Sequence, residues 1–160
     1  MKSSSLSETR ALPAIDLRLQ SKRVPHRFSA EINRLRATLR GKHDSLLITA
    51  LRRELEQLGT AALAADNSTR YIATNAGSRE LTGFSNAELL KLTVIDATPL
   101  PRSEEGRRLW QEFIACGVQR GEYELQRKDG STIRVRYWAY ASVAPGVHVS
   151  LFVPVESTEN

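Results

Sequence analysis

Cysteine is almost absent from this 160-residue sequence, in which Cys116 is the only example. A single thiol excludes a disulfide within the chain and leaves no set of thiolates for a structural metal site. No apolar run approaches the ~20 residues that a membrane-spanning helix needs, and residues 1–20 lack the continuous apolar core of a secretory leader. From these absences we expect a cytoplasmic protein without a membrane span.

Charge is plentiful but unevenly placed. Apolar residues make up 41% of the chain and charged residues 26%, which is ordinary for a globular domain with one core and a short appendage. Residues 1–60 carry 12 Lys and Arg against 6 Asp and Glu, whereas residues 61–160 carry 11 against 12. This asymmetry predicts two functionally separate parts.

The N-terminal part is predicted to contain a tail and a helical extension. Residues 1–28 combine Ser, Pro and basic residues without periodicity, so we expect them to be disordered or loosely attached. From Ser29, a candidate N-cap, apolar residues recur at helical spacing; Gly41 interrupts the pattern, which then continues to Gly59. Residues 29–59 are therefore predicted as an amphipathic helical extension. Its apolar stripe comprises Leu47, Leu51, Leu55 and Leu58.

Residues 60–156 are predicted to form one α+β domain, because the apolar period changes to that of strands and returns to helix only in the middle. The expected strands are 60–66, 70–74, 122–127, 132–143 and 146–155. The expected helices are 75–83, 85–92 and 103–118. Asp129-Gly130 is a hairpin turn in which both residues tolerate positive φ, and Ala144-Pro145-Gly146 is the next turn.

The strand at 132–143 is apolar on both faces. Tyr137 and its alternate neighbours fall on one face, and Trp138 and Tyr140 fall on the other, where water is expected for a half-solvated strand. With Phe152 from the next strand, they would form an apolar patch. Because exposed patches of this kind promote aggregation, we expect the leucine stripe of the extension to cover it, from the same chain or from a partner.

A series of short motifs runs through the predicted domain in a fixed order. The motifs are Asp66-Asn67, Tyr71-Ile72, Asn75, Glu80-Leu81, Gly83-Phe84, Asn86–Leu90, Glu122-Tyr123, Arg127–Ser131 and Pro145-Gly146. In this order and at these intervals, they resemble a PAS domain. The resemblance covers nearly all of the predicted domain. It implies a five-stranded antiparallel sheet with short helices on one face, and we expect the amphipathic helix over the other.

PAS domains, as the resemblance implies, are sensory and dimerisation modules that hold a small ligand, or nothing, between sheet and helices. We therefore expect a stand-alone, non-enzymatic module of bacterial signal transduction or regulation of transcription, paired as a homodimer or with a signalling protein. The expected ligand cavity comprises Asn75, Leu81, Phe84, Leu92, Ile95, Trp110, Phe113, Tyr123, Leu125, Tyr137 and Val149. The expected interface comprises Leu47, Leu51, Leu55, Leu58, Trp138, Tyr140 and Phe152.

Haem and flavin define an alternative class of sensor. The long helix holds no histidine of the kind that ligates haem in family members, and His148 is expected on the outer sheet face. The Asn-Cys-Arg-Phe-Leu-Gln motif of blue-light flavin members is missing, and Cys116 lies elsewhere. The sequence therefore requires no cofactor or metal, and neither haem nor covalent flavin is expected; non-covalent flavin stays open.

Nucleic-acid binding is the other alternative, through the basic segment that includes residues 22–42. Arg134 and Arg136 beside Trp138 and Tyr140 also resemble a stacking surface for single strands. No zinc-ligand spacing, helix-turn-helix pattern or RNP-type strand supports it, so nucleic acid is not the expected partner. For enzymes, G-x-G-x-x-G, P-loop and G-x-S-x-G motifs are all missing from the sequence, and no catalytic residue is predicted.

Overall fold

A single five-stranded antiparallel sheet organises the domain in a computed structural model that describes residues 28–97 and 103–155. The strands lie in the order β2-β1-β5-β4-β3. They are β1 (Ala61–Ala65), β2 (Tyr71–Thr74), β3 (Val118–Gln126), β4 (Thr132–Ala144) and β5 (Val147–Pro154). The helices are α3 (Ser29–Leu39), α4 (Asp44–Glu56), α5 (Ala76–Thr82), α6 (Asn86–Leu89) and α7 (Ser103–Cys116). The tail predicted at 1–28 lies outside the described residues, except for Phe28.

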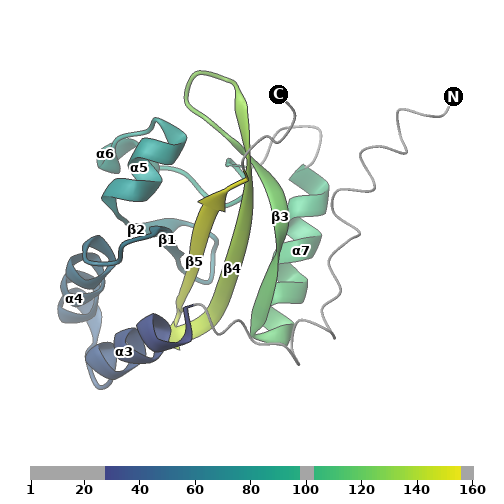
Figure 1. The fold of residues 1–160 in the computed structure, drawn as a ribbon. Coiled ribbons are helices and arrows are strands. Elements are labelled where there is room, and N and C mark those ends of the chain that lie inside the picture. The colour runs from purple at the N-terminus through teal and green to yellow at the C-terminus, as the bar shows by residue number, and fades with distance from the viewer. Residues whose placement is uncertain (1–27, 98–102, 156–160) are drawn as a thin grey trace, which may run out of the picture.

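Helices cover the sheet on both faces (Figure 1). On one face α3 packs against β4 and α4 against β2, while on the other α7 packs against β3 and β4. This arrangement confirms the predicted α+β fold and the predicted helical cover on the second face. The extension is two helices, because Gly41 at φ +78° and Asp44 at φ +53° turn the chain between them.

The apolar residues under α3 and α4 form what we call the outer cluster. The stripe residues Leu51 and Leu55 are fully buried against the sheet, and the ring of Phe28 meets Trp138 edge-to-face at a centroid distance of 5.1 Å. The outer cluster comprises Phe28, Ile32, Leu35, Leu39, Leu47, Ala50, Leu51, Leu55, Ala62, Ala64, Ala73, Trp138, Tyr140, Val143, Ala144, Val147, Val149 and Leu151. The chain's own N-terminal helices therefore shield Trp138 and Tyr140 from water.

The same sheet face becomes charged where the helical cover ends. Arg136 precedes Trp138 by two residues and pairs with Glu122 across the β3–β4 ladder, with Nη2 2.9 Å from Oε2. Arg134 bonds the other oxygen of Glu122 at 3.2 Å. These contacts, Arg136 foremost, hold the pKa of Glu122 below its ordinary value. Because the two arginines are paired and the two aromatics buried, they do not form the stacking surface considered above.

Asn75 joins the extension to the domain. It is the N-cap of α5, as the sequence indicates, and its Oδ1 accepts from the backbone N–H groups of Ser78 and Ala62, both at 3.0 Å. Its Nδ2 donates to the carbonyl oxygens of Leu55 at 3.0 Å and Thr60 at 2.9 Å. Asn75 was predicted to line the cavity, and that placement is wrong: its amide is fully engaged with backbone that links α4, β1 and α5.

The start of α3 and the start of β3 also differ from expectation. The N-cap of α3 is Phe28, so Ser29 is the first helical residue rather than the cap. The strand expected from Glu122 begins at Val118, because Gly117, at φ +93°, ends α7 and turns the chain directly into β3. Ser85 caps α6 as expected, accepting from the Glu88 N–H.

Candidate functional site

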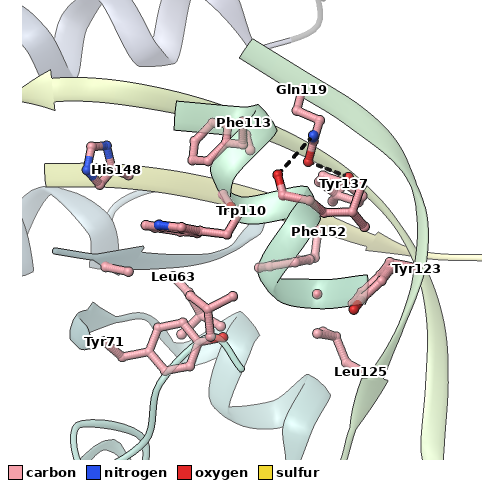
Figure 2. Close-up of a pocket in the computed structure, with 16 residues that line it drawn as sticks. Leu63, Tyr71, Trp110, Phe113, Gln119, Tyr123, Leu125, Tyr137, His148 and Phe152 are labelled. Atoms are coloured by element: carbon pink, nitrogen blue, oxygen red, sulfur yellow. Dashed lines mark hydrogen bonds between the residues drawn. The ribbon is translucent and has the colours of Figure 1, made fainter. Parts of the chain in front are cut away.

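A cavity of about 90 Å³ lies between the inner sheet face and α7 (Figure 2). All five strands contribute to it, and so do three aromatic or aliphatic residues of α7. The lining residues are Leu63, Ala65, Tyr71, Val94, Gly106, Leu109, Trp110, Phe113, Gln119, Tyr123, Leu125, Tyr137, Ala139, His148, Ser150 and Phe152. Its walls are therefore mostly aromatic and aliphatic, with a few polar groups among them.

The structure brings part of the predicted cavity set together. Trp110, Phe113, Tyr123, Leu125 and Tyr137 line the cavity. The buried apolar residues on this side of the sheet form what we call the inner cluster: Leu63, Ala65, Tyr71, Leu81, Leu89, Ala97, Phe113, Leu125, Val135, Tyr137, Ala139, Ala141 and Phe152. Leu81 belongs to it without reaching the cavity, and Phe84 and Leu92 pack against the inner cluster. Ile95 is half-buried and belongs to neither cluster. These four residues support the cavity walls or lie beyond them.

The faces predicted for β5 are inverted. Phe152 pairs with Tyr137 and belongs to the inner cluster, whereas Val149 pairs with Tyr140 and belongs to the outer cluster. Paired residues of antiparallel strands share a face, so Phe152 lines the cavity and Val149 does not. His148 follows the same alternation and lines the cavity, instead of lying on the outer face. Each of these three placements in the prediction is wrong.

Gln119 and Tyr137 form a buried polar pair in the cavity wall. The Tyr137 hydroxyl donates to Gln119 Oε1 at 2.8 Å, and Gln119 Nε2 donates to the Leu109 carbonyl at 3.3 Å (Figure 2). Burial raises the pKa of Tyr137, so its hydroxyl keeps its proton. The pair fixes β3 and β4 against α7 and defines one polar end of the cavity wall.

His148 is held as a neutral ring. Its Nδ1 accepts from the Ser142 N–H at 2.9 Å, so Nε2 carries the proton and donates to Asn67 Oδ1 at 2.7 Å. Its ring lies edge-on to Trp110 and Phe113, with centroids 5.6 and 6.1 Å away. Burial lowers the pKa of His148, and the negative charge of Asp66 opposes this only in part.

The stability of the protein is expected to fall as the pH decreases from about 7 to about 5. The folded chain holds the pKa of His148 below 6.5, so the unfolded chain takes up the proton first and gains free energy relative to the native state. Urea unfolding at a series of pH values measures the effect, and His148→Gln should flatten the slope. His43→Gln, at an exposed position, is the matched control and should keep it. Equal slopes in the wild type and His148→Gln would contradict this assignment.

Two hydroxyl groups in the cavity keep hydrogen-bonding capacity. Among the described residues, Ser150 and Tyr71 line the cavity and their hydroxyl groups have no partner. Burial raises the pKa of Tyr71, which therefore stays neutral. None of the described lining residues is Asp, Glu, Lys or Arg. The cavity thus offers an uncharged, mostly apolar environment with a few polar groups.

The residues present do not fit haem or flavin. Both ring nitrogens of His148 already have partners, so neither is available as an axial ligand without breaking a hydrogen bond. No cysteine is among the described lining residues, and about 90 Å³ is far below the ~300 Å³ at the lower end for cofactor-sized ligands. Within residues 28–97 and 103–155, no group of His, Cys, Asp or Glu side chains is placed to hold a metal ion.

The predicted interface residues are mostly buried within one chain. Leu47, Leu51 and Leu55 belong to the outer cluster with Trp138 and Tyr140, and Leu58 packs at its edge. Phe152 lies on the opposite face, as described above. A second copy of the chain could reach these residues only if α3 and α4 moved.

The architecture is that of a PAS domain. The PAS domain of a protein from Colwellia psychrerythraea is 16% identical, with a TM-score of 0.57 over 64% of this chain and 92% of that one. A LOV protein of Rhodobacter sphaeroides is 12% identical, with a TM-score of 0.57 over 82% of this chain and 70% of that one.

A third similar structure was solved with a ligand. It is the PAS domain, in complex with ethanol, of a LuxR-family transcriptional regulator from Burkholderia thailandensis, which is 14% identical, with a TM-score of 0.55 over 66% of this chain and 96% of that one. No family model matches the sequence, and a search of curated proteins finds no match. In the part of the chain that the structure describes, no helix is long and apolar enough to cross a membrane.

Proposed function

We propose that the chain is a non-enzymatic sensory module of signal transduction that binds a small, uncharged molecule in the inner cavity. The observation that carries the proposal is the cavity itself, which has aromatic walls and no ionised side chain among its described lining residues. A water-sized group takes up ~30 Å³, so the cavity of about 90 Å³ holds roughly three such groups. Ethanol and 1-propanol, with three and four non-hydrogen atoms, are close to this size and can bond the Ser150 and Tyr71 hydroxyl groups.

The comparison structures support the proposal. A PAS domain of the same fold was solved with ethanol and belongs to a transcriptional regulator, and another comes from a sensor histidine kinase and response regulator. A role in regulation of transcription, through a homodimer or a protein partner, is the setting we propose for this chain. Ligand binding in the cavity would change how α3 and α4 pack on the sheet, and the partner would respond to that change.

Strand β5 provides a physical route by which ligand binding in the cavity can affect the outer helices. His148 faces the cavity, whereas its neighbours Val147 and Val149 face the outer cluster. A ligand that shifts His148 therefore also shifts residues on which the outer helices rest. Because His148 bonds Ser142, the same shift reaches the end of β4, where Ser142 has a positive φ of 54°.

The experiment compares 1-propanol with propionate in a titration of the full chain followed by amide NMR. Propanol is expected to produce saturable shifts at Trp110 and Ser150, and propionate none, because the described lining residues include no Lys or Arg to offset the desolvation of a carboxylate. Ser150→Ala should weaken propanol binding up to about tenfold, the equivalent of ~1.4 kcal/mol for one lost hydrogen bond.

Hydrogen exchange and light scattering test the sensory part. Propanol should change amide protection in α3 and α4 or the mass of the particle in solution. Binding without either change would disprove the proposed output, and a panel of short alcohols and ketones that all fail to bind would disprove the ligand class. A flavin or haem band in the visible spectrum of the purified protein would favour the alternative sensor.

A further inference from the structure

A second, polar groove lies apart from the cavity, where α4 meets β2, α5 and α6. It is lined by Arg52, Glu56, Thr74, Arg79, Ser85 and Asn86, none of which lines the inner cavity. The groove joins the N-terminal extension to the helical layer of the domain. A ligand there would contact both parts.

Two arginines from different helices are fixed on β2 within this groove. Arg52 of α4 donates through Nε to the Ile72 carbonyl at 3.0 Å. Arg79 of α5 donates through Nη1 to the Thr74 hydroxyl at 3.0 Å. Ile72 and Thr74 are two positions apart on one strand, about 7 Å at ~3.4 Å per residue. The two guanidinium groups are therefore held near each other before any ligand arrives.

The acceptors of the groove already have donors. Glu56 Oε1 accepts from the Ala76 N–H at 3.0 Å, and its Oε2 accepts from Arg79 at 2.8 Å. The Thr74 hydroxyl accepts from Arg79 and donates to Asn86 Oδ1 at 2.7 Å. The Arg79 hydrogen bond also lowers the pKa of Glu56, which stays ionised at neutral pH.

Several donors are left over. Among the described residues, the Nη groups of Arg52, Nε and Nη2 of Arg79, and Nδ2 of Asn86 have no partner. Two guanidinium groups against one carboxylate also leave the groove one positive charge in excess. A surface with unused donors, engaged acceptors and excess positive charge is complementary to an anion that only accepts hydrogen bonds.

We propose that this groove binds a phosphate group carried by a small molecule. The unused donors come from three elements, α4, α5 and α6, so they approach from different directions. A tetrahedral phosphate presents acceptor oxygens in as many directions, whereas a planar carboxylate does not. Bound phosphate would bridge Arg52 on the outer cover and Arg79 on the domain and so hold α4 in place. The proposal does not depend on the ligand proposed for the cavity.

The test is a titration of the full chain with inorganic phosphate, followed by NMR of the arginine Nε–H groups and the Asn86 side-chain amide. We expect saturable shifts of the Arg52 and Asn86 resonances with a Kd on the order of 1 mM. Arg52→Gln should weaken binding at least ~10-fold. Arg53→Gln is the matched control, since the adjacent Arg53 pairs with Glu54 at 3.7 Å and does not line the groove; it should leave the Kd unchanged.

Three results would overturn the proposal. Sodium chloride at equal ionic strength could reproduce the shifts, which would mean screening rather than binding. Arg52→Gln and Arg53→Gln could weaken binding equally, which would mean a diffuse effect of positive charge. Acetate could bind as tightly as phosphate, which would remove the assignment to a tetrahedral anion. A urea titration of Arg52→Gln checks that any loss of binding is not a loss of folding.

Discussion

Replacing Trp138 by alanine is expected to lower the free energy of unfolding by about 3–5 kcal/mol, the usual range for a buried Trp. The indole is 6% exposed and contacts Phe28 edge-to-face beneath α3. Its removal leaves a cavity that the helix and the sheet can fill only in part. Urea unfolding of the full chain, followed by far-UV circular dichroism, measures the change.

Arg136→Ala is the control, because Arg136 precedes Trp138 by two residues on the same face of β4. Its side chain is exposed and pairs with Glu122 at 2.9 Å, so the loss should be below ~1 kcal/mol, as is usual for an exposed ion pair. Similar losses at the two positions would mean that α3 and α4 do not cover the sheet in solution. A much larger loss for Trp138→Ala than for Arg136→Ala would show that α3 and α4 cover Trp138 and leave Arg136 exposed.

The helical cover over Trp138 and Tyr140 is a feature that the sequence predicts well. Alternation in β4 places Trp138 and Tyr140 on the face opposite Tyr137, and only a covering element makes two such aromatics compatible with a folded chain in water. The leucine stripe supplies that element at helical spacing. Local periodicity and burial therefore point to the same answer, which is why the layers of the fold could be inferred.

The faces of β5 could not be inferred in the same way, because His148 and Ser150 alternate with apolar residues, and a polar face is ordinarily the solvated one. In the structure this face lines the cavity instead. The turn predicted before β5 includes Ala144. In the structure β4 continues through Ala144, which pairs with Val147, so the loop has only two residues, Pro145 and Gly146. One residue more or less in a hairpin loop reverses every side chain of the next strand. The pairing also shifts register between Tyr140 and Ala144, beyond which Tyr140 pairs with Val149 and Tyr137 with Phe152.

Two of the cavity residues that were not predicted, Leu63 and Ala65, lie on a strand without a polar side. Leu63 and Ala65 belong to the apolar run of β1, which packs on both faces, so periodicity does not show which residues point inward. Gln119 and His148 are polar and were not expected in an apolar cavity. Gln119 lies 18 residues from its partner Tyr137, and His148 lies 81 residues from Asn67, so only the tertiary structure reveals these pairs.

Asn75→Ala is the second change with a large expected effect, about 3 kcal/mol of lost stability. Asn75 is 1% exposed, and its amide makes four hydrogen bonds to backbone groups of α4, the segment after it, β1 and α5. Alanine would leave those buried donors and acceptors without partners, and each such group costs about 1–3 kcal/mol unless water reaches it. Urea unfolding measures the total loss of stability, and hydrogen exchange of the Ala62 and Ser78 amides shows whether the loss arises at these bonds.

Ser85→Ala separates the capping contribution from the long-range one. Ser85 caps α6 through the same kind of bond, to the Glu88 N–H at 3.1 Å, but it is exposed and makes no bond to α4 or β1. Loss of this cap should cost about 1 kcal/mol. If Asn75→Ala costs no more than Ser85→Ala, the bonds to Leu55 and Thr60 contribute nothing, and Asn75 does not fasten the extension to the domain. A clear excess, with faster exchange in α4, would show that this side chain couples the outer helices to the layer that carries the cavity.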